Sequence, residues 1–508
     1  MTDRRAEFGD FQTPLALARD TCRLLAASGV RPRSLIEPTC GTGTFIVAAL
    51  ETFRDVTHVL GMDIRSSYVE QARHALEGLG YGGTLELWQG DFFETDWSTV
   101  LSRIPQPVLV VGNPPWVTNS ELGALRSCNV PHKANFNNHA GIEAITGKSN
   151  FDISEWMINK LLETMSQARG TVAMLCKTSV ARKALAEAWR DGHRIGQAKT
   201  YAIDAATHFG VAVDACLLVC ESAEGRQSGS VCGVHASLWA SRPQQTIGYR
   251  HGDVVSDAAL YDRWRHLEGS SPYLWRSGVK HDCAKIMELR RRGDGWLNGL
   301  GEQVTLEDSC LFPMLKSSDV ANGREPTRWM LVPQREMGED TSRIRRAAPR
   351  TWAYLARHAE RLDARASTIY RKRPRFSVFG IGPYTFAPWK VAVAGFYRGI
   401  DFRVIGPQGA TPVVFDDTVY FLPCATEAEA QLLARLLNAP PAQSFISSLI
   451  FHGTKRPITA QVLRRLDLCA LARELGQERE LIEHAARNHY LIPGTISGQQ
   501  SLPLTFGG

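Results

Sequence analysis

Long hydrophobic runs are missing from the sequence, and no stretch approaches the ~18 consecutive apolar residues of a membrane span. Residues 1–11 are polar and charged, which is untypical of a secretory signal. The 11 cysteines include no Cys-x-x-Cys pair, and the closest two are Cys216 and Cys220. These absences disfavour a membrane protein, a zinc site and a disulfide framework, and they predict a cytoplasmic protein without a metal centre.

A strong overall charge is also missing, because 58 Lys and Arg residues face 52 Asp and Glu residues. The basic residues are nevertheless concentrated in one region. Residues 271–400 hold 23 Lys and Arg against 13 Asp and Glu, and between Arg343 and Arg375 11 basic residues face only Glu360 and Asp363. A regional excess of this size favours contact with a polyanion such as nucleic acid.

The first 220 residues alternate short β-rich runs with helical patterns, which is typical of a parallel, doubly wound α/β sheet. Apolar residues recur at helical spacing in Leu15–Ala27 and Ile153–Ser166. The Gly- and Ser-rich residues Ala223–Gly233 then interrupt the pattern and predict a nearby domain boundary. The expected strands are Ser34–Glu37, His58–Ile64, Leu85–Gln89, Val108–Gly112, Thr171–Cys176, Ala198–Ile203 and Ala212–Cys220.

With 508 residues, the chain is long enough for more than one domain. After residue 270 the pattern changes to strand-like pieces such as Val391–Tyr397 and Thr418–Leu422 and a helical run over Glu427–Asn438, which indicates a second, α+β unit. We therefore expect a first domain over 1–235, a linker over 236–270, a second domain over 271–485 and a loose tail over 486–508.

Residues 34–43, with the sequence Ser-Leu-Ile-Glu-Pro-Thr-Cys-Gly-Thr-Gly, predict a strand that ends in a glycine turn and opens a helix. Gly41 and Gly43 would let a ligand approach backbone N–H groups closely. The third glycine of a dinucleotide fingerprint is absent, and Ile46 stands in its place. This difference disfavours NAD and FAD as the ligand.

Acidic residues end the next two expected strands. Asp63 comes 20 residues after Gly43, at a position from which a carboxylate accepts hydrogen bonds from ribose hydroxyls. Asp91 and Phe92 would offer a carboxylate and an aromatic edge to an adenine. An Asp at a strand end often caps a helix instead, but three such strand ends in register favour a ribosyl ligand.

The most specific motif is Val111-Gly112-Asn113-Pro114-Pro115-Trp116, at the end of the fourth expected strand. Two successive prolines fix an extended, rigid turn. They would hold the side-chain oxygen of Asn113 and the carbonyl of Pro114 as paired acceptors at the carboxyl edge of the sheet, where open α/β sheets bind ligands. One strand after a ribosyl site, this turn indicates catalysis.

Together these motifs resemble those of the S-adenosylmethionine-dependent amino-methyltransferases, above all the DNA adenine-N6 methyltransferases of the TaqI and Eco57I kind from restriction-modification systems. The resemblance implies a Rossmann-like, mostly parallel catalytic sheet whose last strand is antiparallel, followed by an α+β target-recognition domain. It extends through Phe376–Tyr384 and Lys455–Thr459 and so covers nearly the whole chain. It departs from the family at Trp116, where Tyr is the commoner residue.

The resemblance also implies roles for individual residues. Asn113, Pro114, Pro115 and Trp116 would be catalytic, and Phe209 would stack on an adenine flipped out of the duplex. The implied cofactor is S-adenosylmethionine. Its implied ligands are Phe11, Thr13 and Pro14 of an upstream motif together with Glu37, Pro38, Thr39, Gly41, Gly43, Asp63, Ile64, Asp91 and Phe92.

Double-stranded DNA is the implied substrate, and a separate restriction endonuclease or other defence partner is an implied companion. The alternatives are the same transfer to RNA adenine, to cytosine N4 or to a protein glutamine, and a non-catalytic DNA-binding subunit. The size and basicity of the second unit disfavour a small protein substrate, and Asn rather than Ser at position 113 disfavours cytosine. Phosphate contacts are expected from Arg343, Arg345, Arg346, Arg371, Lys372, Arg373, Arg375, Lys455 and Arg456.

Overall fold

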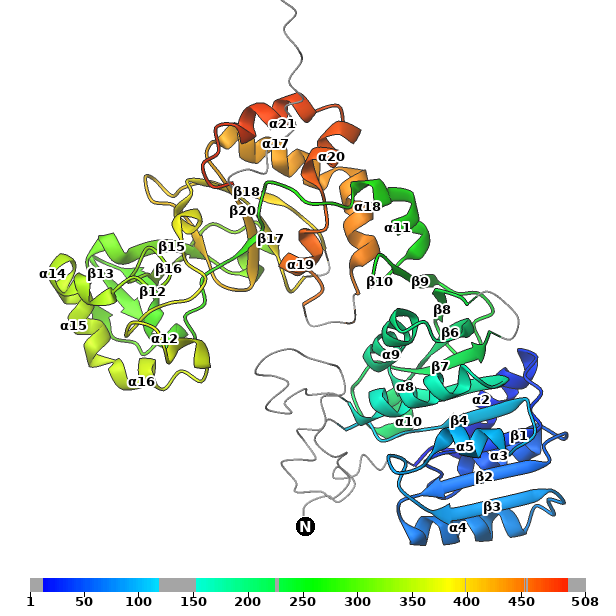
Figure 1. The fold of residues 1–508 in the computed structure, drawn as a ribbon. Helices are drawn as coiled ribbons and strands as arrows, with labels where there is room; N and C mark the ends of the chain where they lie inside the picture. The colour runs from blue at the N-terminus through cyan, green and yellow to red at the C-terminus, as the bar shows by residue number, and fades with distance from the viewer. Residues whose placement is uncertain are drawn as a thin grey trace, which may run out of the picture. The chain divides into compact units, whose positions relative to one another are not determined.

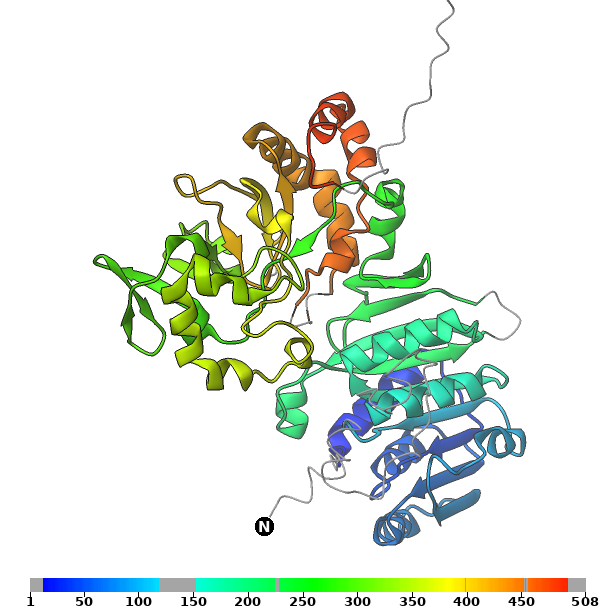
Figure 2. The same cartoon turned by 60° about the vertical axis from the view of Figure 1, so that its left-hand side comes forward.

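The chain divides into two compact units, Met1–Ala258 and Ala259–Gly508. The computed structural model describes residues 12–117, 152–223, 228–397, 399–451, 453 and 456–491. The first unit runs from blue to green and the second from green to red (Figure 1, and turned in Figure 2). Among the described residues, no helix is both long and apolar enough to cross a membrane.

A ten-stranded sheet forms the centre of the first unit, with the order β10-β9-β8-β6-β7-β5-β4-β1-β2-β3. Strands β1 to β5 are parallel, and β7 runs antiparallel between β5 and β6. This arrangement confirms the predicted doubly wound, mostly parallel sheet. The strands are β1 (Ser34–Glu37), β2 (His58–Asp63), β3 (Thr84–Gln89), β4 (Val108–Gly112), β5 (Gly170–Lys177), β6 (Ile195–Ile203), β7 (Ala215–Ser222), β8 (Val231–His235), β9 (Gln245–Arg250) and β10 (Asp253–Val255).

Three strands beyond β7 correct the predicted boundary. Strand β8 pairs in parallel with β6, and β9 and β10 follow it as antiparallel neighbours. The expected interruption at Ala223–Gly233 is therefore not a domain boundary: Val231–Gly233 already belong to β8 of the same sheet, and β7 is not the last strand. Residues 236–258 belong to the first unit rather than to a linker, because their strands continue its hydrogen-bonded ladder.

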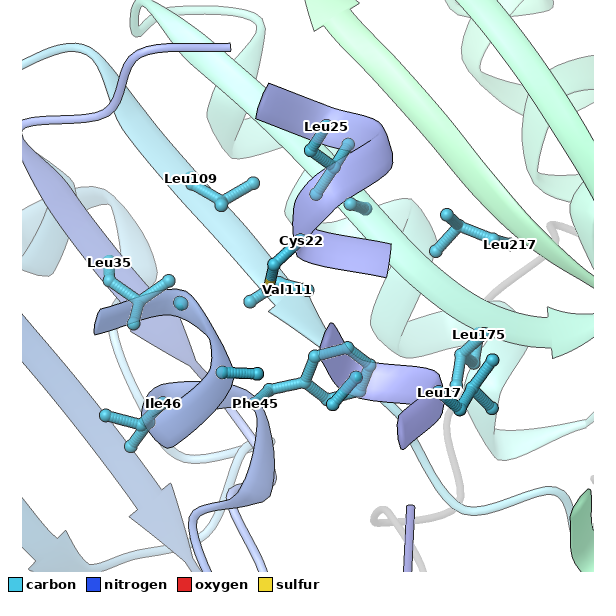
Figure 3. Packing of buried hydrophobic residues seen from close by; sticks show 14 of the residues in the cluster. Leu17, Cys22, Leu25, Leu35, Phe45, Ile46, Leu109, Val111, Leu175 and Leu217 are labelled. Carbon is cyan, nitrogen blue, oxygen red and sulfur yellow. The ribbon is translucent and has the colours of Figure 1, made fainter. Parts of the chain in front are cut away.

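Helices cover both faces of this sheet. One face carries α2 (Leu15–Ala27), α3 (Thr44–Thr52) and α4 (Ser66–Glu77), and the other carries α5 (Trp97–Ser102), α8 (Ile153–Met165) and α9 (Thr178–Arg190). Leu17 and Leu25 of α2 and Phe45 of α3 pack on Val111 and Leu217 of the strands (Figure 3). Because successive strand residues face opposite ways, one face of β4 supports this cluster while the other supports α8. The short helix α10 (Ala205–Phe209) follows β6.

The second unit contains two sheets, ordered β14-β13-β12-β16-β15-β19 and β11-β20-β17-β18. Its α+β composition agrees with the predicted class. Its strands are β11 (Arg276–Ser277), β12 (Glu288–Arg292), β13 (Gly295–Asn298), β14 (Gln303–Val304), β15 (Leu311–Leu315), β16 (Arg328–Leu331), β17 (Trp389–Ala394), β18 (Arg403–Ile405), β19 (Val414–Phe415) and β20 (Val419–Cys424).

Short helices surround these sheets, and α17 has the bounds that its apolar period predicts. The helices are α11 (Ala258–Trp264), α12 (Ala284–Met287), α13 (Ser317–Ala321), α14 (Ile344–Ala347), α15 (Pro349–Arg357), α16 (Ala359–Asp363), α17 (Glu427–Asn438), α18 (Pro440–Leu449), α19 (Ala460–Leu463), α20 (Leu468–Glu474) and α21 (Glu478–Ala485). After α21, Asn488 is buried and donates hydrogen bonds to the carbonyl of Pro423 (3.1 Å) and to Glu429 (2.8 Å). Asn488 is therefore not part of a loose tail, and residues 492–508 of the expected tail lie outside the described residues.

A lysine lies inside the second unit. The side chain of Lys390, on the inner strand β17, is 1% exposed, and its ammonium group donates a hydrogen bond to the carbonyl of Ala387 at 2.5 Å. Burial disfavours the charged form and lowers the pKa of Lys390 to about 7.

Candidate active site

A pocket lies at the carboxyl ends of β1, β2, β3 and β4 in the first unit. Strand β1 lies between β2 and β4, so the strand order reverses at this point, which is where doubly wound sheets bind ligands. The pocket encloses about 850 Å³, part of it open to solvent. It is lined by Gln12, Thr13, Glu37, Pro38, Thr39, Cys40, Gly41, Thr44, Met62, Asp63, Ile64, Arg65, Gly90, Asp91, Phe92, Phe93, Asn113, Pro115, Ile153 and Met157.

Most residues expected around a cofactor line this pocket, as do two residues of the Asn-Pro-Pro turn. Pro14, Gly43, Pro114, Trp116 and Phe209 are not among its lining residues. Phe11 lies outside the described residues. Gln12, which also lines the pocket, lies within the upstream motif Phe11–Pro14. The sequence gives no signal for the further lining residues Cys40, Thr44, Met62, Arg65, Gly90, Phe93, Ile153 and Met157.

The glycine turn joins β1 to α3. Gly41 and Gly43 have φ angles of +49° and +80°, in a backbone region that residues other than glycine rarely adopt. A Cβ atom on Gly41 would lie 2.7 Å from Oε1 of Gln12, and one on Gly43 would lie 3.0 Å from the Cβ of Ala72. Gln12 in turn accepts a hydrogen bond from the backbone N–H of Thr42 at 3.4 Å. The upstream segment therefore packs directly against the glycine turn.

Glu37 ends β1 and is buried beneath the turn. Its Oε2 accepts a hydrogen bond from the N–H of Ile46 at 3.2 Å, in the first turn of α3. This contact places a carboxyl group at a helix amino terminus, which favours negative charge. Burial nevertheless dominates, and it raises the pKa of Glu37 well above its usual range; the nearby charge of Asp63 raises it further.

Asp63 ends β2 and is 9% exposed. Its Oδ2 accepts a hydrogen bond from the N–H of Gly41 and its Oδ1 accepts one from the N–H of Arg65, both at 3.0 Å. The carboxylate therefore fixes the glycine turn of one strand against the end of the next. A carboxylate oxygen can accept more than one hydrogen bond.

Asp91 follows β3 and opens a short turn. Its Oδ1 accepts a hydrogen bond from the N–H of Phe93 at 2.8 Å. Phe92 packs on Trp97 with ring centroids 4.9 Å apart, and Phe93 packs on Trp156 of α8 at 4.8 Å. Both phenylalanines line the pocket, so its aromatic edge is wider than the sequence predicts.

The Asn-Pro-Pro turn follows β4, and its residues Asn113 and Pro115 face the same pocket as the glycine turn. The backbone carbonyl of Asn113 accepts a hydrogen bond from the hydroxyl of Thr39 at 3.5 Å. Thr39 precedes the glycine turn, so this contact links the two turns. The structure thus brings the predicted catalytic asparagine to the predicted cofactor residues.

Trp116 lies in the core rather than on the pocket wall. Its side chain is 6% exposed, and its indole N–H donates a hydrogen bond to the carbonyl of Leu175 at 3.3 Å. The ring contacts Phe209 edge to face, with centroids 5.2 Å apart and planes at 70°. The half-buried Phe209 therefore lies next to the Asn-Pro-Pro turn although 93 residues separate it from Trp116.

The predicted phosphate contacts of the second unit fall into two groups. Arg343 and Arg375 form ion pairs with Glu339 (2.8 Å) and Asp363 (2.7 Å). Elsewhere in this basic region, Arg350 forms an ion pair with Glu307 at 3.7 Å, and the guanidinium of Arg345 stacks on Trp352. All seven of the residues predicted between Arg343 and Arg375 are exposed, including Arg346, Arg371, Lys372 and Arg373. Lys455 lies outside the described residues.

Arg456 combines its charge with an exposed aromatic ring. Its guanidinium lies 4.6 Å from the ring centroid of Phe396 and 3.5 Å from Asp417. Phe396 and the adjacent Tyr397 are 37% and 39% exposed, unusually high values for large apolar side chains. An exposed ring beneath an arginine suits contact with both phosphate and base.

The sheet order, the glycine turn and the acidic residues at successive strand ends define the class as the Rossmann-like S-adenosylmethionine-dependent methyltransferases. No family model matches the chain. The chain is similar in structure to the type IIL restriction-modification enzyme MmeI, solved in complex with DNA, with a TM-score of 0.51 at 14% identity. The match covers 88% of this chain and 64% of that chain, so this chain spans less than two thirds of the MmeI chain.

A curated relative identifies the family. The chain is 43% identical over 472 residues to the type II methyltransferase M.NspV of Nostoc sp.. The match covers 92% of this chain and 98% of the relative. The chain therefore belongs to the type II methyltransferases of restriction-modification systems.

Proposed function

We propose that this chain methylates N6 of adenine in duplex DNA, with S-adenosylmethionine as the methyl donor. The modification would protect sites that a separate endonuclease cuts. One observation carries the proposal: Asn113 and Pro115 line the same pocket as Gly41, Asp63 and Asp91. Had the Asn-Pro-Pro turn faced away from the glycine turn, the acceptor oxygens and the cofactor residues would not meet.

The side chains of the pocket fit this cofactor. Glu37, Asp63 and Asp91 supply three carboxyl groups, which suits a ligand that carries positive charge. Phe92 and Phe93 supply an apolar edge for an adenine ring. Asp63 would accept hydrogen bonds from the ribose hydroxyls and Asp91 from the adenine amino group. When bound, the cofactor supplies an electrophilic methyl group on a sulfonium.

The Asn-Pro-Pro turn would supply hydrogen-bond acceptors for the amino group of the target base. The lone pair of adenine N6 is delocalised into the ring, so the amino group is a poor nucleophile. The side-chain oxygen of Asn113 and the carbonyl of Pro114 would accept its two hydrogens and stabilise the positive charge that grows on nitrogen. Transfer would form an N–C bond as the C–S bond breaks, and the proton lost from the nitrogen would go to solvent. Holding both reactants ~3 to 3.5 Å apart supplies much of the rate.

A base inside a duplex cannot reach this turn and must be extruded, which costs a few kcal/mol. Phe209 would stack on the extruded base. Trp116 is buried and contacts Phe209. Its role would therefore be to support the Phe209 ring rather than to stack on the base itself.

The second unit would bind the DNA around the target. Arg371, Lys372 and Arg373 are exposed successive cations, which suits phosphate contacts. Phe396 and Arg456 would contact bases and backbone nearby. Base contacts of this kind give specificity, whereas phosphate contacts give affinity.

Long-read sequencing that detects modified bases tests the proposal. DNA from cells that express the wild-type chain is compared with DNA from cells that express Asn113→Ala. We expect modified adenines in one sequence context, present only with the wild type. Modified cytosines instead would support N4 transfer, and unmodified DNA would point to RNA. Calorimetry that detects no S-adenosylmethionine binding would indicate a non-catalytic subunit.

A further inference from the structure

Lys177, the last residue of β5, lies next to the segment that follows the two prolines. We propose that Lys177 is a positioning residue that holds the Asn113–Trp116 turn in place for methyl transfer. The inference rests on the proposed function only in giving Asn113 the acceptor role.

The ammonium group of Lys177 makes two contacts. It donates a hydrogen bond to the carbonyl of Trp116 at 3.1 Å and forms an ion pair with Oδ2 of Asp152 at 2.7 Å. The Lys177 side chain is 23% exposed and that of Asp152 is 8% exposed. Water therefore screens this ion pair less than a surface pair, and its geometry is correspondingly better defined.

Asp152 links Lys177 to a helix that lines the pocket. Its Oδ1 accepts a hydrogen bond from the N–H of Ser154 at 3.1 Å and so caps the amino terminus of α8. Ile153 and Met157 of this helix line the pocket. The same ammonium group therefore contacts both the catalytic turn and the helix opposite it.

A backbone hydrogen bond closes the arrangement into a ring. The N–H of Ile153 donates to the carbonyl of Val117 at 3.0 Å. The ring runs from Trp116 through Lys177, Asp152 and Ile153 to Val117, which follows Trp116 in the chain. The residues before Trp116 are the two prolines, which transmit its position to Asn113 because their φ angles are fixed.

The strand register explains why residue 177 occupies this place. Strands β4 and β5 are parallel, and Gly112 lies opposite Met174. Residue 177 therefore lies beside the residues that follow β4. Removing its ammonium group would leave the buried carboxylate of Asp152 without its cation and release the carbonyl of Trp116. Displacements of ~1 Å at a reacting group can reduce a rate ~100-fold.

The test compares Lys177→Met and Lys177→Arg with the matched control Lys183→Met. Lys183 also forms an ion pair with α8, at 2.9 Å from Glu155, but the structure gives it no contact with the turn. Total transfer of a radiolabelled methyl group is measured in single turnovers on unmodified phage DNA, whichever base accepts it. Calorimetry measures the affinity for S-adenosylmethionine in parallel.

We expect Lys177→Met to slow transfer ~10- to 100-fold with cofactor affinity unchanged. Lys177→Arg should restore part of the rate, and Lys183→Met should behave as the wild type. Equal rates for Lys177→Met and Lys183→Met would overturn the inference, as would a parallel loss of cofactor affinity. If Lys177→Met fails to fold, Asp152→Asn removes the charge pair more mildly and should also slow transfer. Digestion of the product identifies the methylated base, so an error in the proposed target is seen separately.

Discussion

The backbone N–H of Gly41 donates a hydrogen bond to Oδ2 of Asp63 at 3.0 Å, and this bond joins the turn after β1 to the end of β2. Because Oδ1 of the same carboxylate accepts from Arg65, both oxygens hold backbone amides. One side chain therefore shapes two walls of the pocket. An amide in its place could accept only one of these hydrogen bonds.

We accordingly expect Asp63→Asn to weaken S-adenosylmethionine binding at least tenfold, because its NH₂ group would face a backbone N–H and one acceptor would be lost. Isothermal calorimetry measures the affinity. Asp55→Asn, an exposed substitution in the same unit, is the control and should bind as the wild type. Unchanged affinity in Asp63→Asn would contradict the role of Asp63.

Cofactor binding should depend on pH through Glu37. Burial raises the pKa of this carboxyl group, and a cationic ligand would favour its ionised form. The bound state then holds fewer protons than the free state, so affinity should rise with pH until Glu37 is ionised in both states. Calorimetry in buffers of different ionisation enthalpy should detect proton release.

Glu37→Gln should lose this proton release, whereas Glu77→Gln, at an exposed carboxylate, should keep it. Proton release that persists in Glu37→Gln would contradict the assignment to Glu37.

Phe209→Ala should slow methylation most where extrusion of the base is costly. Once sequencing has identified the target site, the variant is assayed on an intact duplex and on one with an abasic position opposite the target. We expect a larger loss on the intact duplex, because stacking offsets the cost of extrusion. Wild-type rates on both substrates would exclude stacking by Phe209. Val213→Ala, an exposed apolar residue of the same unit, is the control.

Phe396 and Arg456 should affect DNA binding in different ways. Arg456→Gln should weaken binding and reduce the slope of log K against log salt by ~0.9, because one phosphate contact is lost. Phe396→Ala should weaken binding without changing the slope, because a ring releases no counterions. Fluorescence anisotropy at several salt concentrations measures both. Ile482→Ala, at an exposed residue on α21, should change neither quantity.

Lys390→Met should stabilise the second unit at neutral pH. The pKa of Lys390 is about 7 in the folded protein against an ordinary 10.5, so between these values the unfolded chain binds a proton that the folded chain does not. The free energy of unfolding of the wild type should therefore rise with pH across this range.

The advantage of Lys390→Met should be largest below about pH 7 and should shrink as the pH approaches 10. Urea unfolding at several pH values measures it, and the exposed Lys285→Met is the control. An advantage that does not vary with pH would contradict the assignment to Lys390.

It could be predicted that the motif residues lie close together, because the carboxyl ends of parallel strands lie at the same edge of a sheet. Glu37, Asp63, Asp91 and Asn113 each follow or end a strand with clear turn signals, and all four line one pocket. Strand boundaries differ from the expected ones by one to three residues where a strand frays into a polar turn. The fold class followed from the same pattern.

Other features depend on contacts that no local pattern contains. The burial of Trp116 is set by the carbonyl of Leu175 and the ring of Phe209, both distant in sequence. Lys177 ends an apolar strand as many surface lysines do, and its contacts with Asp152 and with the carbonyl of Trp116 distinguish it. Strand β8 pairs directly with β6, although β7 lies between these two strands in the sequence. The Gly- and Ser-rich residues before β8 are also typical of linkers.

The three strands after β7 change what the sheet offers to its surroundings. Without them the nine-residue strand β6 would be the edge strand of the sheet and would present a row of unpaired N–H and C=O groups. With them the edge strand is β10, which is only three residues long and begins at the exposed Asp253. A short edge strand that begins with a charged residue is a poor template for pairing with a strand of another chain. We therefore expect the three added strands to prevent aggregation through this edge of the sheet at high protein concentration.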